Sequence, residues 1–228
     1  DDLSFYVKKG EIFVILGGSG SGKSTLLRHM IGLERPESGR IIINGTDIAE
    51  CSGKEYTAAL RKIGVLFQGS ALLGSMTVGE NVALPIREHT TLTSRAAAEM
   101  VKMKLALVGL QHYEHHLPSE ISGGMKKRAG LARALALNPE IILLDEPAAG
   151  MNPIETNSLM TFIQELNREG YTIVVIEHDM KFIMSMAHKV LVLNFGQKIS
   201  EGSPAHVQND EDVIVAYFGK GLKVGGEH

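Results

Sequence analysis

Apolar residues recur along this chain in short runs of the length of a β-strand. Several runs are apolar at consecutive positions rather than at alternate ones, which is typical of strands that helices cover on both faces. A helix is predicted from Pro153 to about Arg168, because proline favours the first turn of a helix and Gly170 follows its end. The pattern therefore predicts an α/β fold with a mainly parallel sheet. The strand-like runs are 12–16, 41–43, 63–67, 141–144, 172–176 and 190–193.

Such runs are missing between about residues 71 and 138. Residues 77–86, 94–108 and 123–137 are predicted to be helices instead. We therefore expect an α/β core made of residues 1–70 and 138–228, with a helical subdomain of residues 71–137 inserted into it. The glycine-rich end at 219–226 is expected to be a frayed tail.

The composition narrows the class of protein. The 228 residues suffice for one domain with an insertion or for two small domains. A hydrophobic fraction of 44% and a charged fraction of 21% are typical of a globular protein with a sizeable core. No apolar run reaches the ~18–20 residues that a membrane helix needs. The single cysteine, Cys51, cannot form a disulfide within the chain, so a reduced, cytosolic setting is expected.

The net charge of −3 argues against nucleic acid as a partner, because binding to a phosphate backbone requires a basic face. One basic cluster is present on a predicted helix. We expect it to be a solvated helix face. Its members are Lys126, Lys127, Arg128 and Arg133.

A glycine-rich loop with a lysine at its end follows the first apolar run. A strand, a glycine turn and a helix start in this order form a phosphate-binding loop, because glycines let successive backbone N–H groups point at phosphate oxygens. Lys23 is predicted to reach the β- and γ-phosphates, Ser24 to ligate Mg²⁺, and Thr25 to lie beside the α-phosphate. A flexible Gly/Ser turn would not explain the Lys-Ser ending. The predicted nucleotide-binding residues are Gly17, Gly18, Ser19, Gly20, Ser21, Gly22, Lys23, Ser24 and Thr25.

Two adjacent carboxylates, Asp145 and Glu146, follow the apolar run 141–144. Ligands bind at the carboxyl edge of parallel sheets. We expect Asp145 to hold Mg²⁺ through water, opposite Ser24, and Glu146 to polarise the attacking water as a general base. The alternative is a solvated acidic turn at the end of a strand.

Gln68 and His178 each end another predicted strand at the same edge. The Gln68 amide can contact both the metal ion and the attacking water. His178 can donate a hydrogen bond to the γ-phosphate or orient Glu146. Each of the two residues, taken alone, also fits an ordinary structural position at the end of a strand.

A second anion site is predicted where Ser122, Gly123 and Gly124 open a long helix. One nucleotide cannot touch two helix N-termini this far apart in a single chain. We therefore expect two copies to face each other head to tail, with the second copy offering Ser122 and Gly124 to the γ-phosphate. An ordinary capped helix is the alternative.

The ordered set of these motifs closely resembles the ATPase subunits of ABC transporters, over essentially the whole chain. The resemblance implies a RecA-like P-loop core that carries the Walker motifs and an inserted helical subdomain that carries the signature motif. It also implies a nucleotide-dependent homodimer with ATP and Mg²⁺ between the two copies. The dimer would act on integral membrane permease subunits, which bind a groove near the Q-loop (the segment starting at Gln68) and the helical subdomain. The chain would then lie on the cytoplasmic face of the membrane.

Three departures from the family pattern change these expectations. Met125 replaces the usual signature glutamine, and Asn152 stands where an aspartate is usual, which we expect to weaken communication across the dimer. Residues 3–11 resemble the second strand of the family pattern. The earlier strand and its adenine-stacking aromatic residue are not in this sequence, so we expect weaker ATP binding.

The subfamily signal is divided. Segments before residue 134 are similar to the ATPases of MCE-associated (Mla-type) phospholipid transporters, whereas segments from residue 144 onward are similar to branched-chain amino-acid importer ATPases. This suggests a mosaic joined near residues 136–144, with natural drift between subfamilies as the alternative. Because the first half lines the permease groove, lipid is favoured over amino acid as cargo. Two rival functions are a soluble, non-transport ABC ATPase and a nucleotide-gated interaction module without turnover.

Overall fold

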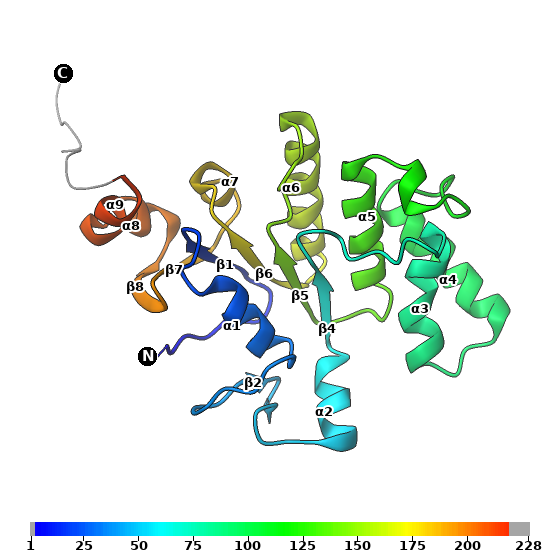
Figure 1. Cartoon of the computed structure of the whole chain (residues 1–228), viewed down its shortest axis with the longest axis horizontal. Coiled ribbons are helices and arrows are strands. Elements are labelled where there is room, and N and C mark those ends of the chain that lie inside the picture. The colour runs from blue at the N-terminus through cyan, green and yellow to red at the C-terminus, as the bar shows by residue number, and fades with distance from the viewer. Residues whose placement is uncertain (1–2, 219–228) are drawn as a thin grey trace.

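A computed structural model describes residues 3–218, with the backbone alone at residues 181, 182 and 218. The predicted tail at 219–226 lies outside the described residues. A six-stranded sheet forms the centre of the molecule (Figure 1). In spatial order its strands are β4 (Ile63–Leu66), β5 (Ile141–Asp145), β6 (Thr172–Glu177), β1 (Ile12–Gly17), β7 (Lys189–Asn194) and β8 (Gln197–Gly202).

The first five strands run parallel, as the consecutive apolar positions predict. All six residues of β1 and all six of β6 are buried, because helices cover both faces of the sheet. The sequence did not predict β8, which pairs antiparallel with β7 at the edge. Its polar residues Gln197, Lys198 and Ser200 hide the apolar signal of a strand.

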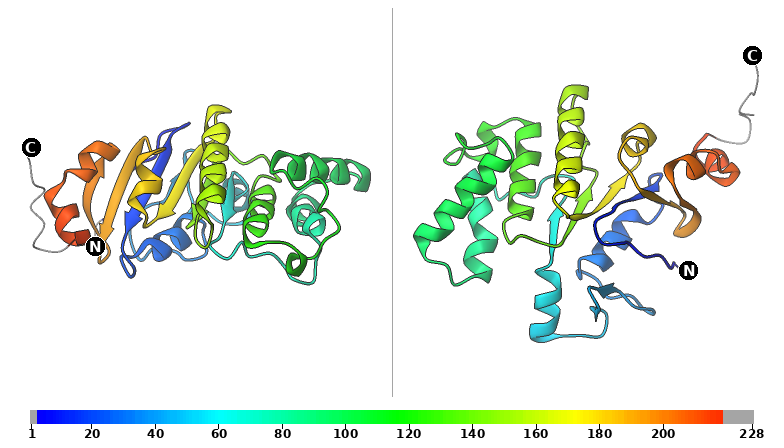
Figure 2. Two further views of the ribbon diagram at one scale, coloured as in Figure 1. Left: turned by 90° about the horizontal axis from the view of Figure 1, so that it is seen from above. Right: turned by 180° about the vertical axis from the view of Figure 1, so that it is seen from behind.

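Helices pack on the two faces of this sheet (Figure 2). Ile12, Val14 and Leu16 of β1 contact the cluster that contains Ile163 of α6, while Phe13 and Ile15 belong to the cluster on the other face, with Leu27 of α1. This alternation follows from the two-residue period of a strand. The helices flanking the sheet are α1 (Lys23–Met30), α2 (Gly53–Leu60), α6 (Pro153–Arg168), α7 (Met180–Met184), α8 (Pro204–Gln208) and α9 (Glu211–Phe218). A small hairpin, β2 (Ile42–Ile43) and β3 (Thr46–Asp47), lies beside them.

The segment between β4 and β5 is helical, which confirms the predicted interruption of the strands. It has its own buried cluster, which includes Val82, Ile86, Val101 and Leu105. Thr77 and Glu80 form a capping box that fixes the start of the first helix. The elements of this segment are α3 (Val78–His89), α4 (Ser94–Leu107), η1 (Pro118–Glu120) and α5 (Gly123–Ala134). The division into a core and a helical subdomain at residues 71 and 137 remains a prediction.

The expectation of a strand within residues 3–11 is wrong. These residues belong to no strand, although Leu3, Phe5 and Val7 pack against the sheet. The ring of Phe5 stacks on that of Phe13 with centroids 5.4 Å apart, and the Ser4 carbonyl accepts a hydrogen bond from Lys198 Nζ at 2.8 Å. These side-chain contacts replace the ladder hydrogen bonds of a strand. Within the described residues, no helix combines the length and the apolar character required to cross a membrane.

Two isoleucines allow a matched test of this core. Ile173 of β6 is fully buried, whereas Ile154 of α6 is 82% exposed. We expect Ile173→Ala to lower the free energy of unfolding by about 2–5 kcal/mol, because it removes buried methyl groups and leaves a cavity. Ile154→Ala should change it by no more than about 0.5 kcal/mol. Urea unfolding followed by circular dichroism measures both, and equal losses would contradict the assigned core.

Candidate functional site

The carboxyl ends of three neighbouring parallel strands carry most of the predicted site residues. The register pairs Leu16 with Glu177 and Asp145 with Ile176, so the segments that follow β1, β5 and β6 leave the sheet at one level. Leu66 pairs with Leu144, which brings the Q-loop after β4 to the same edge. The sheet thus brings together loops that are far apart in the sequence.

The glycine-rich loop has the backbone that its sequence predicts. Gly20 and Gly22 have left-handed φ angles of 76° and 97°, which favour glycine. A Cβ at Gly17 would lie 2.8 Å from the Leu193 carbonyl, so a side chain cannot fit there. No side chain caps the N-terminus of α1, and its first turn contains no acidic residue. The first-turn N–H groups therefore have no acceptor within the helix and are suited to an anion.

Lys23 lies inside this loop. Its side chain is 7% exposed, and Nζ donates hydrogen bonds to the carbonyls of Gly17 at 2.6 Å and Gly18 at 2.9 Å. Burial lowers the pKa of Lys23, and the carboxylates of Glu146 and Asp145 act in the opposite direction. Ser24 and Thr25 are exposed on the first turn of α1. The loop therefore presents an ammonium and two hydroxyls beside uncapped amides.

Asp145, Glu146 and Gln68 form a hydrogen-bonded group. Gln68 Nε2 donates to Glu146 Oε2 at 2.6 Å, and the Gln68 backbone N–H bonds to the Asp145 carboxylate. Burial, and next the charge of Glu146, raise the pKa of Asp145. Glu146 has a left-handed φ of 42°, which is uncommon outside glycine and occurs at functional sites. The prediction that Gln68 shares a site with the two carboxylates is thus consistent with the contacts.

His178 lies between two carboxylates. Its Nδ1 is 3.5 Å from Glu146 Oε1 and 3.6 Å from Glu177 Oε2, and its ring is largely exposed. One oxygen of Glu146 therefore faces His178 while the other is held by Gln68. An imidazole in this position is able to orient Glu146, as the sequence suggested.

Glu177 and Lys127 join the site, although the sequence analysis did not select either as functional. Glu177 is 2% exposed and accepts hydrogen bonds from the backbone N–H groups of His178 at 3.0 Å and Ala148 at 3.4 Å. Burial raises the pKa of Glu177. A carboxylate at the end of an apolar strand, directly before His178, was the signal that could have identified it.

The expectation that the basic cluster on α5 is a solvated face is wrong for Lys127. This side chain is 6% exposed, and Nζ donates to the Glu146 carbonyl at 2.9 Å. Arg133 also reaches inward, donating to the carbonyls of Ser70 at 2.8 Å and Ala71 at 2.7 Å. Both side chains therefore contact backbone segments of the edge where β4 and β5 end, and α5 also packs against β4.

The predicted second anion site is at the N-terminus of α5. Ser122 caps the helix by accepting from the Met125 N–H at 3.2 Å, and Ser122 and Gly123 are exposed. Gly124 is buried, and a Cβ there would lie 2.5 Å from Glu155 Oε1 of α6. In the views of Figures 1 and 2, α6 lies between α5 and α1. The structure thus keeps Ser122 apart from the loop that carries Lys23.

The donor types fit magnesium and a triphosphate. Ser24 offers a hydroxyl, Gln68 an amide oxygen and Asp145 a carboxylate, and Mg²⁺ prefers such oxygen ligands. Lys23 and the amides of α1 suit phosphate oxygens. Within the described residues, no cluster of histidine, cysteine and carboxylate side chains forms a separate metal site.

The buried carboxylate Glu177 predicts a pH effect. Its raised pKa means that, above the ordinary value of 4.5, the folded chain holds this proton more tightly than the unfolded chain. The free energy of unfolding therefore falls as pH rises through the window between the ordinary and the raised pKa. Glu177→Gln removes the titration and keeps one acceptor oxygen, as a protonated glutamate does.

We therefore expect the melting temperature of Glu177→Gln, relative to that of the unaltered protein, to rise as the pH increases from the ordinary glutamate pKa of 4.5 through the raised pKa of Glu177. Thermal unfolding in a series of buffers measures this difference. If the difference in melting temperature stayed constant or fell, burial would not disfavour the ionised form of Glu177.

Comparisons with known proteins agree with this geometry. A family model described as ABC transporter matches residues 1–149, and one described as branched-chain amino acid ATP-binding cassette transporter matches residues 197–222. The chain is 42% identical over 226 residues, 99% of its length, to the probable ribonucleotide transport ATP-binding protein mkl of Mycobacterium tuberculosis, strain ATCC 25618 / H37Rv. It spans 63% of that protein's length.

A second relative is the intermembrane phospholipid transport system ATP-binding protein MlaF of Haemophilus influenzae. It is 40% identical over 226 residues, which are 99% of this chain and 86% of MlaF. The solved dimer of the ATP-binding cassette MJ0796 with ADP and Pi superposes with a TM-score of 0.81 at 31% identity, over 88% of each chain. The predicted fold class is confirmed, and this chain belongs to the ABC transporter family of ATP-binding proteins.

Proposed function

We propose that this chain is the ATP-hydrolysing subunit of an ABC transporter and that it powers the movement of phospholipid across or between membranes. The observation that carries the proposal is the meeting of the Lys23 loop with Gln68, Glu146 and His178 at one edge of the sheet. Family membership supports the reaction class. The acid–base group and the phosphate-binding loop argue against an interaction module without turnover.

Each residue has a distinct role in this proposal. Lys23 supplies positive charge beside the β- and γ-phosphates, and the amides of α1 bind the phosphate oxygens. Ser24, Gln68 and Asp145 hold Mg²⁺, which neutralises charge on the phosphates when bound. Glu146 accepts the proton of the attacking water, while His178 keeps its carboxylate oriented.

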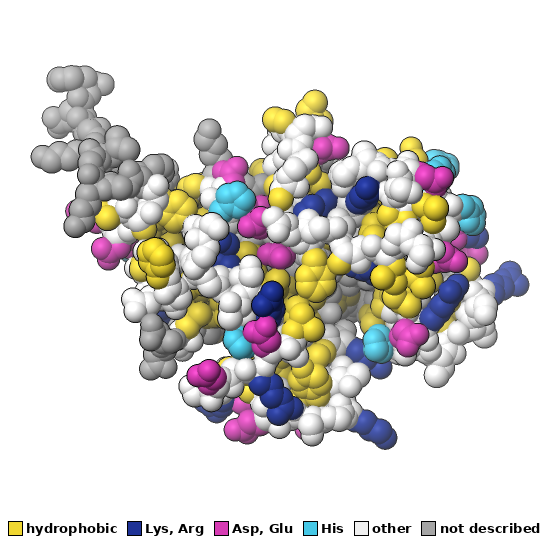
Figure 3. Space-filling model, in the orientation of Figure 1, with side chains coloured by type: hydrophobic (Ala, Val, Ile, Leu, Met, Phe, Trp, Pro, Cys, Tyr) yellow, Lys and Arg dark blue, Asp and Glu magenta, His cyan; other side chains and the backbone are white. Residues whose placement is uncertain are grey.

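The complete site requires two copies of the chain. Ser122 and Gly123 are exposed at the N-terminus of α5, which lies beyond α6 from the Lys23 loop of its own chain. Ile154 is 82% exposed on α6, and Figure 3 shows hydrophobic side chains gathered over one end of α6. We propose a head-to-tail dimer in which Ser122 and the N–H groups of one copy bind the γ-phosphate held by the other. The dimeric state of the related cassette MJ0796 supports this arrangement.

A charge placed at Ser122 tests this composite site without removing the helix cap. Aspartate and asparagine cap helices about as well as serine, but only aspartate repels a phosphate. We use the Glu146→Gln background, in which loss of the general base should slow phosphate release at least about 100-fold while ATP still binds. Ser122→Asp should abolish the ATP-dependent dimer in this background, and Ser122→Asn should retain it. Light scattering with size-exclusion chromatography measures the dimer.

Mixing variants supplies the control. Chains with Lys23→Met are mixed with chains with Ser122→Asp, and each variant should be inactive alone. A mixed dimer of the two would contain one intact site and one doubly altered site. Recovery of ATP hydrolysis on mixing supports the two-chain site. No recovery, together with an intact dimer for Ser122→Asp, would show that the site lies within one chain.

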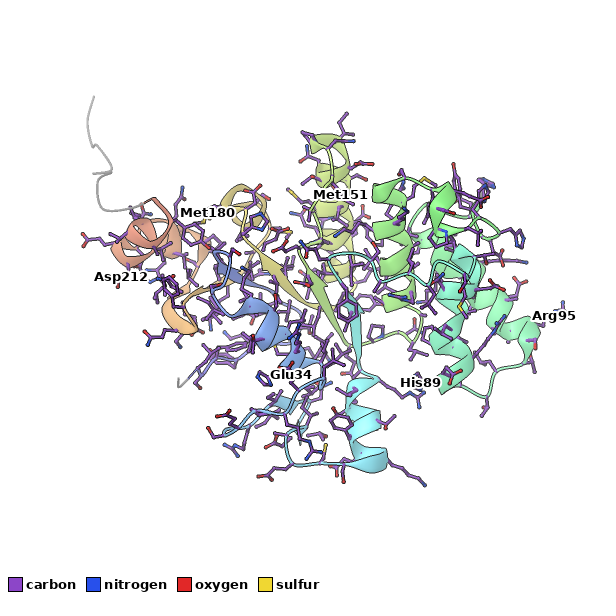
Figure 4. The ribbon with its side chains drawn as sticks, in the orientation of Figure 1. Glu34, His89, Arg95, Met151, Met180 and Asp212 are labelled. Atoms are coloured by element: carbon purple, nitrogen blue, oxygen red, sulfur yellow. The ribbon has the colours of Figure 1, made fainter. Side chains whose placement is uncertain are left out.

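A surface pocket supports the permease as partner. It has a volume of about 620 Å³ and lies between α2 and the end of α3, where Figure 4 labels His89. The Arg61 guanidinium donates to the His89 carbonyl at 2.6 Å and so ties the core to the helical segment there. We propose that permease segments bind the groove between the α/β core and the helical segment, of which this pocket forms one end. The pocket is lined by Arg61, Glu88, His89, Thr90, Thr91 and Leu92.

The names of the relatives point to more than one cargo. MlaF is named for phospholipid transport and matches 99% of this chain, which supports a lipid. The match of residues 197–222 to branched-chain amino-acid transporters favours an amino acid instead. A mosaic chain stays our hypothesis for this division. We give the first half more weight, because partner choice depends on the groove.

Segment exchange tests which half selects the permease. Replacing residues 71–137 by the corresponding segment of a branched-chain importer ATPase should move co-purification from a phospholipid permease to a branched-chain one. Replacing residues 197–218 should not. ATPase stimulation by each permease gives a second readout. A partner that follows residues 197–218 would favour the amino-acid alternative, and stimulation by neither permease would favour a non-transport ATPase.

A further inference from the structure

Lys127 makes a contact that a surface lysine does not make. It lies in the middle of α5 and is 6% exposed, and its Nζ donates to the Glu146 carbonyl at 2.9 Å. Burying an ammonium costs free energy unless polar or charged groups compensate for the lost water. The hydrogen bond to the Glu146 carbonyl offsets part of this cost, so the buried ammonium is held against the backbone of the proposed general base.

The backbone of Glu146 is constrained on both sides. Its N–H donates to the Ile176 carbonyl at 2.9 Å, and its carbonyl accepts from the Ala149 N–H at 3.1 Å in addition to Lys127. Its φ of 42° is strained for a residue with a side chain, so it persists only where surrounding contacts hold it. Within the described part of the chain, Lys127 is the side chain that hydrogen-bonds to this backbone.

The direction in which the Glu146 carboxylate points depends on this backbone. With φ near 42°, Oε2 accepts from Gln68 and Oε1 faces His178. A return of φ to the ordinary negative range would rotate the Cα–Cβ bond and move both oxygens away from these partners. Contacts on the carbonyl of Glu146 therefore also set the position of its carboxylate.

The electrostatic surroundings of Lys127 are consistent with this role. Asp145, Glu177 and Glu146 each act to raise its pKa, against the larger opposing effect of burial. Three carboxylates thus stabilise the ammonium in the position where it meets the Glu146 carbonyl. A neutral apolar side chain would leave that carbonyl with Ala149 alone.

The same helix contacts the Q-loop. Arg133, further along α5, donates to the carbonyls of Ser70 and Ala71, whose φ angles of 62° and 49° are also left-handed. One rigid helix thus holds two strained backbone segments, one after Gln68 and one at Glu146. Its own N-terminus is the exposed Ser122 tip.

We propose that Lys127 is a positioning residue that holds the strained backbone of Glu146 and thereby places its carboxylate for catalysis. This inference rests on the proposed function, since it assumes that Glu146 is the general base. It assigns α5 a role within its own chain, in addition to the binding of the partner's nucleotide at Ser122. Lys127 touches no reacting atom in this assignment and acts only through Glu146.

The test compares Lys127→Met with a matched lysine elsewhere. Lys104 of α4 also donates to a residue with a left-handed φ, Asn138, at 2.6 Å, but Asn138 precedes β5 and lies at the opposite edge of the sheet from Asp145. We expect Lys127→Met to lower kcat at least about tenfold, because small misplacement of a catalytic group is costly. ATP affinity should stay within about twofold. Lys104→Met should leave both unchanged.

A double variant separates positioning from a general structural effect. If Lys127 acts through the Glu146 carboxylate, adding Lys127→Met to Glu146→Gln should cause no further loss of phosphate release. Rates are measured as single-turnover phosphate release, and affinity with a fluorescent ATP analogue. Should Lys127→Met not fold, Lys127→Leu removes the same donor with an apolar side chain suited to the buried site and carries the same expectations.

The outcomes distinguish the two levels of the proposal. An unchanged kcat for the Lys127 variant, with loss in Glu146→Gln, would overturn the positioning role and leave the proposed function intact. Additive losses in the double variant would also overturn it. Unchanged hydrolysis in Glu146→Gln would instead overturn the assignment of Glu146, and the positioning role would fail with it.

Discussion

Parallel hydrogen bonding among β1, β5 and β6 is the constraint on which the rest of the structure depends. It sets Leu16 beside Glu177 and Asp145 beside Ile176, so the segments after the three strands leave the sheet at one level. A slip of one residue would turn the buried side chains of β1 to the wrong helix layer, which the packing on both faces forbids. The aliphatic core therefore determines the geometry of the polar groups at the edge.

Those polar groups form a compact set of opposite charges. Asp145, Glu146 and Glu177 lie close to Lys23 and Lys127, and burial shifts the pKa values of both lysines, Asp145 and Glu177 toward their neutral forms. The free-energy cost of burying each charge is offset in part by the opposite charges beside it. A bound triphosphate and its metal ion would add charges to this set. Nucleotide binding would therefore change the electrostatic interactions that hold the acidic side chains in place.

Much of the fold could be predicted from the sequence, because its strands are buried on both faces and appear as unbroken apolar runs. β8 could not, since Ile199 is the one aliphatic side chain among its six residues, which lie at an edge of the sheet. The P-loop could be predicted because glycines followed by Lys23 at that spacing, between a strand and a helix, are typical of phosphate binding. Lys127 could not: a lysine among other basic residues on a helix has the pattern of a solvated face, and only the packing of α5 on the core shows otherwise.

The edge of the sheet formed by β8 has a consequence for association between molecules. Lys198 forms an ion pair with Glu201 at 2.8 Å, Ser200 Oγ donates to Asp210 Oδ2 at 2.7 Å, and α8 and α9 pack on this strand. Charged side chains and covering helices disfavour the addition of a foreign strand to an open sheet. The β8 edge of the sheet is thus protected against edge-to-edge aggregation. The aliphatic strands inside the sheet are therefore not extended by strands of other molecules at this edge.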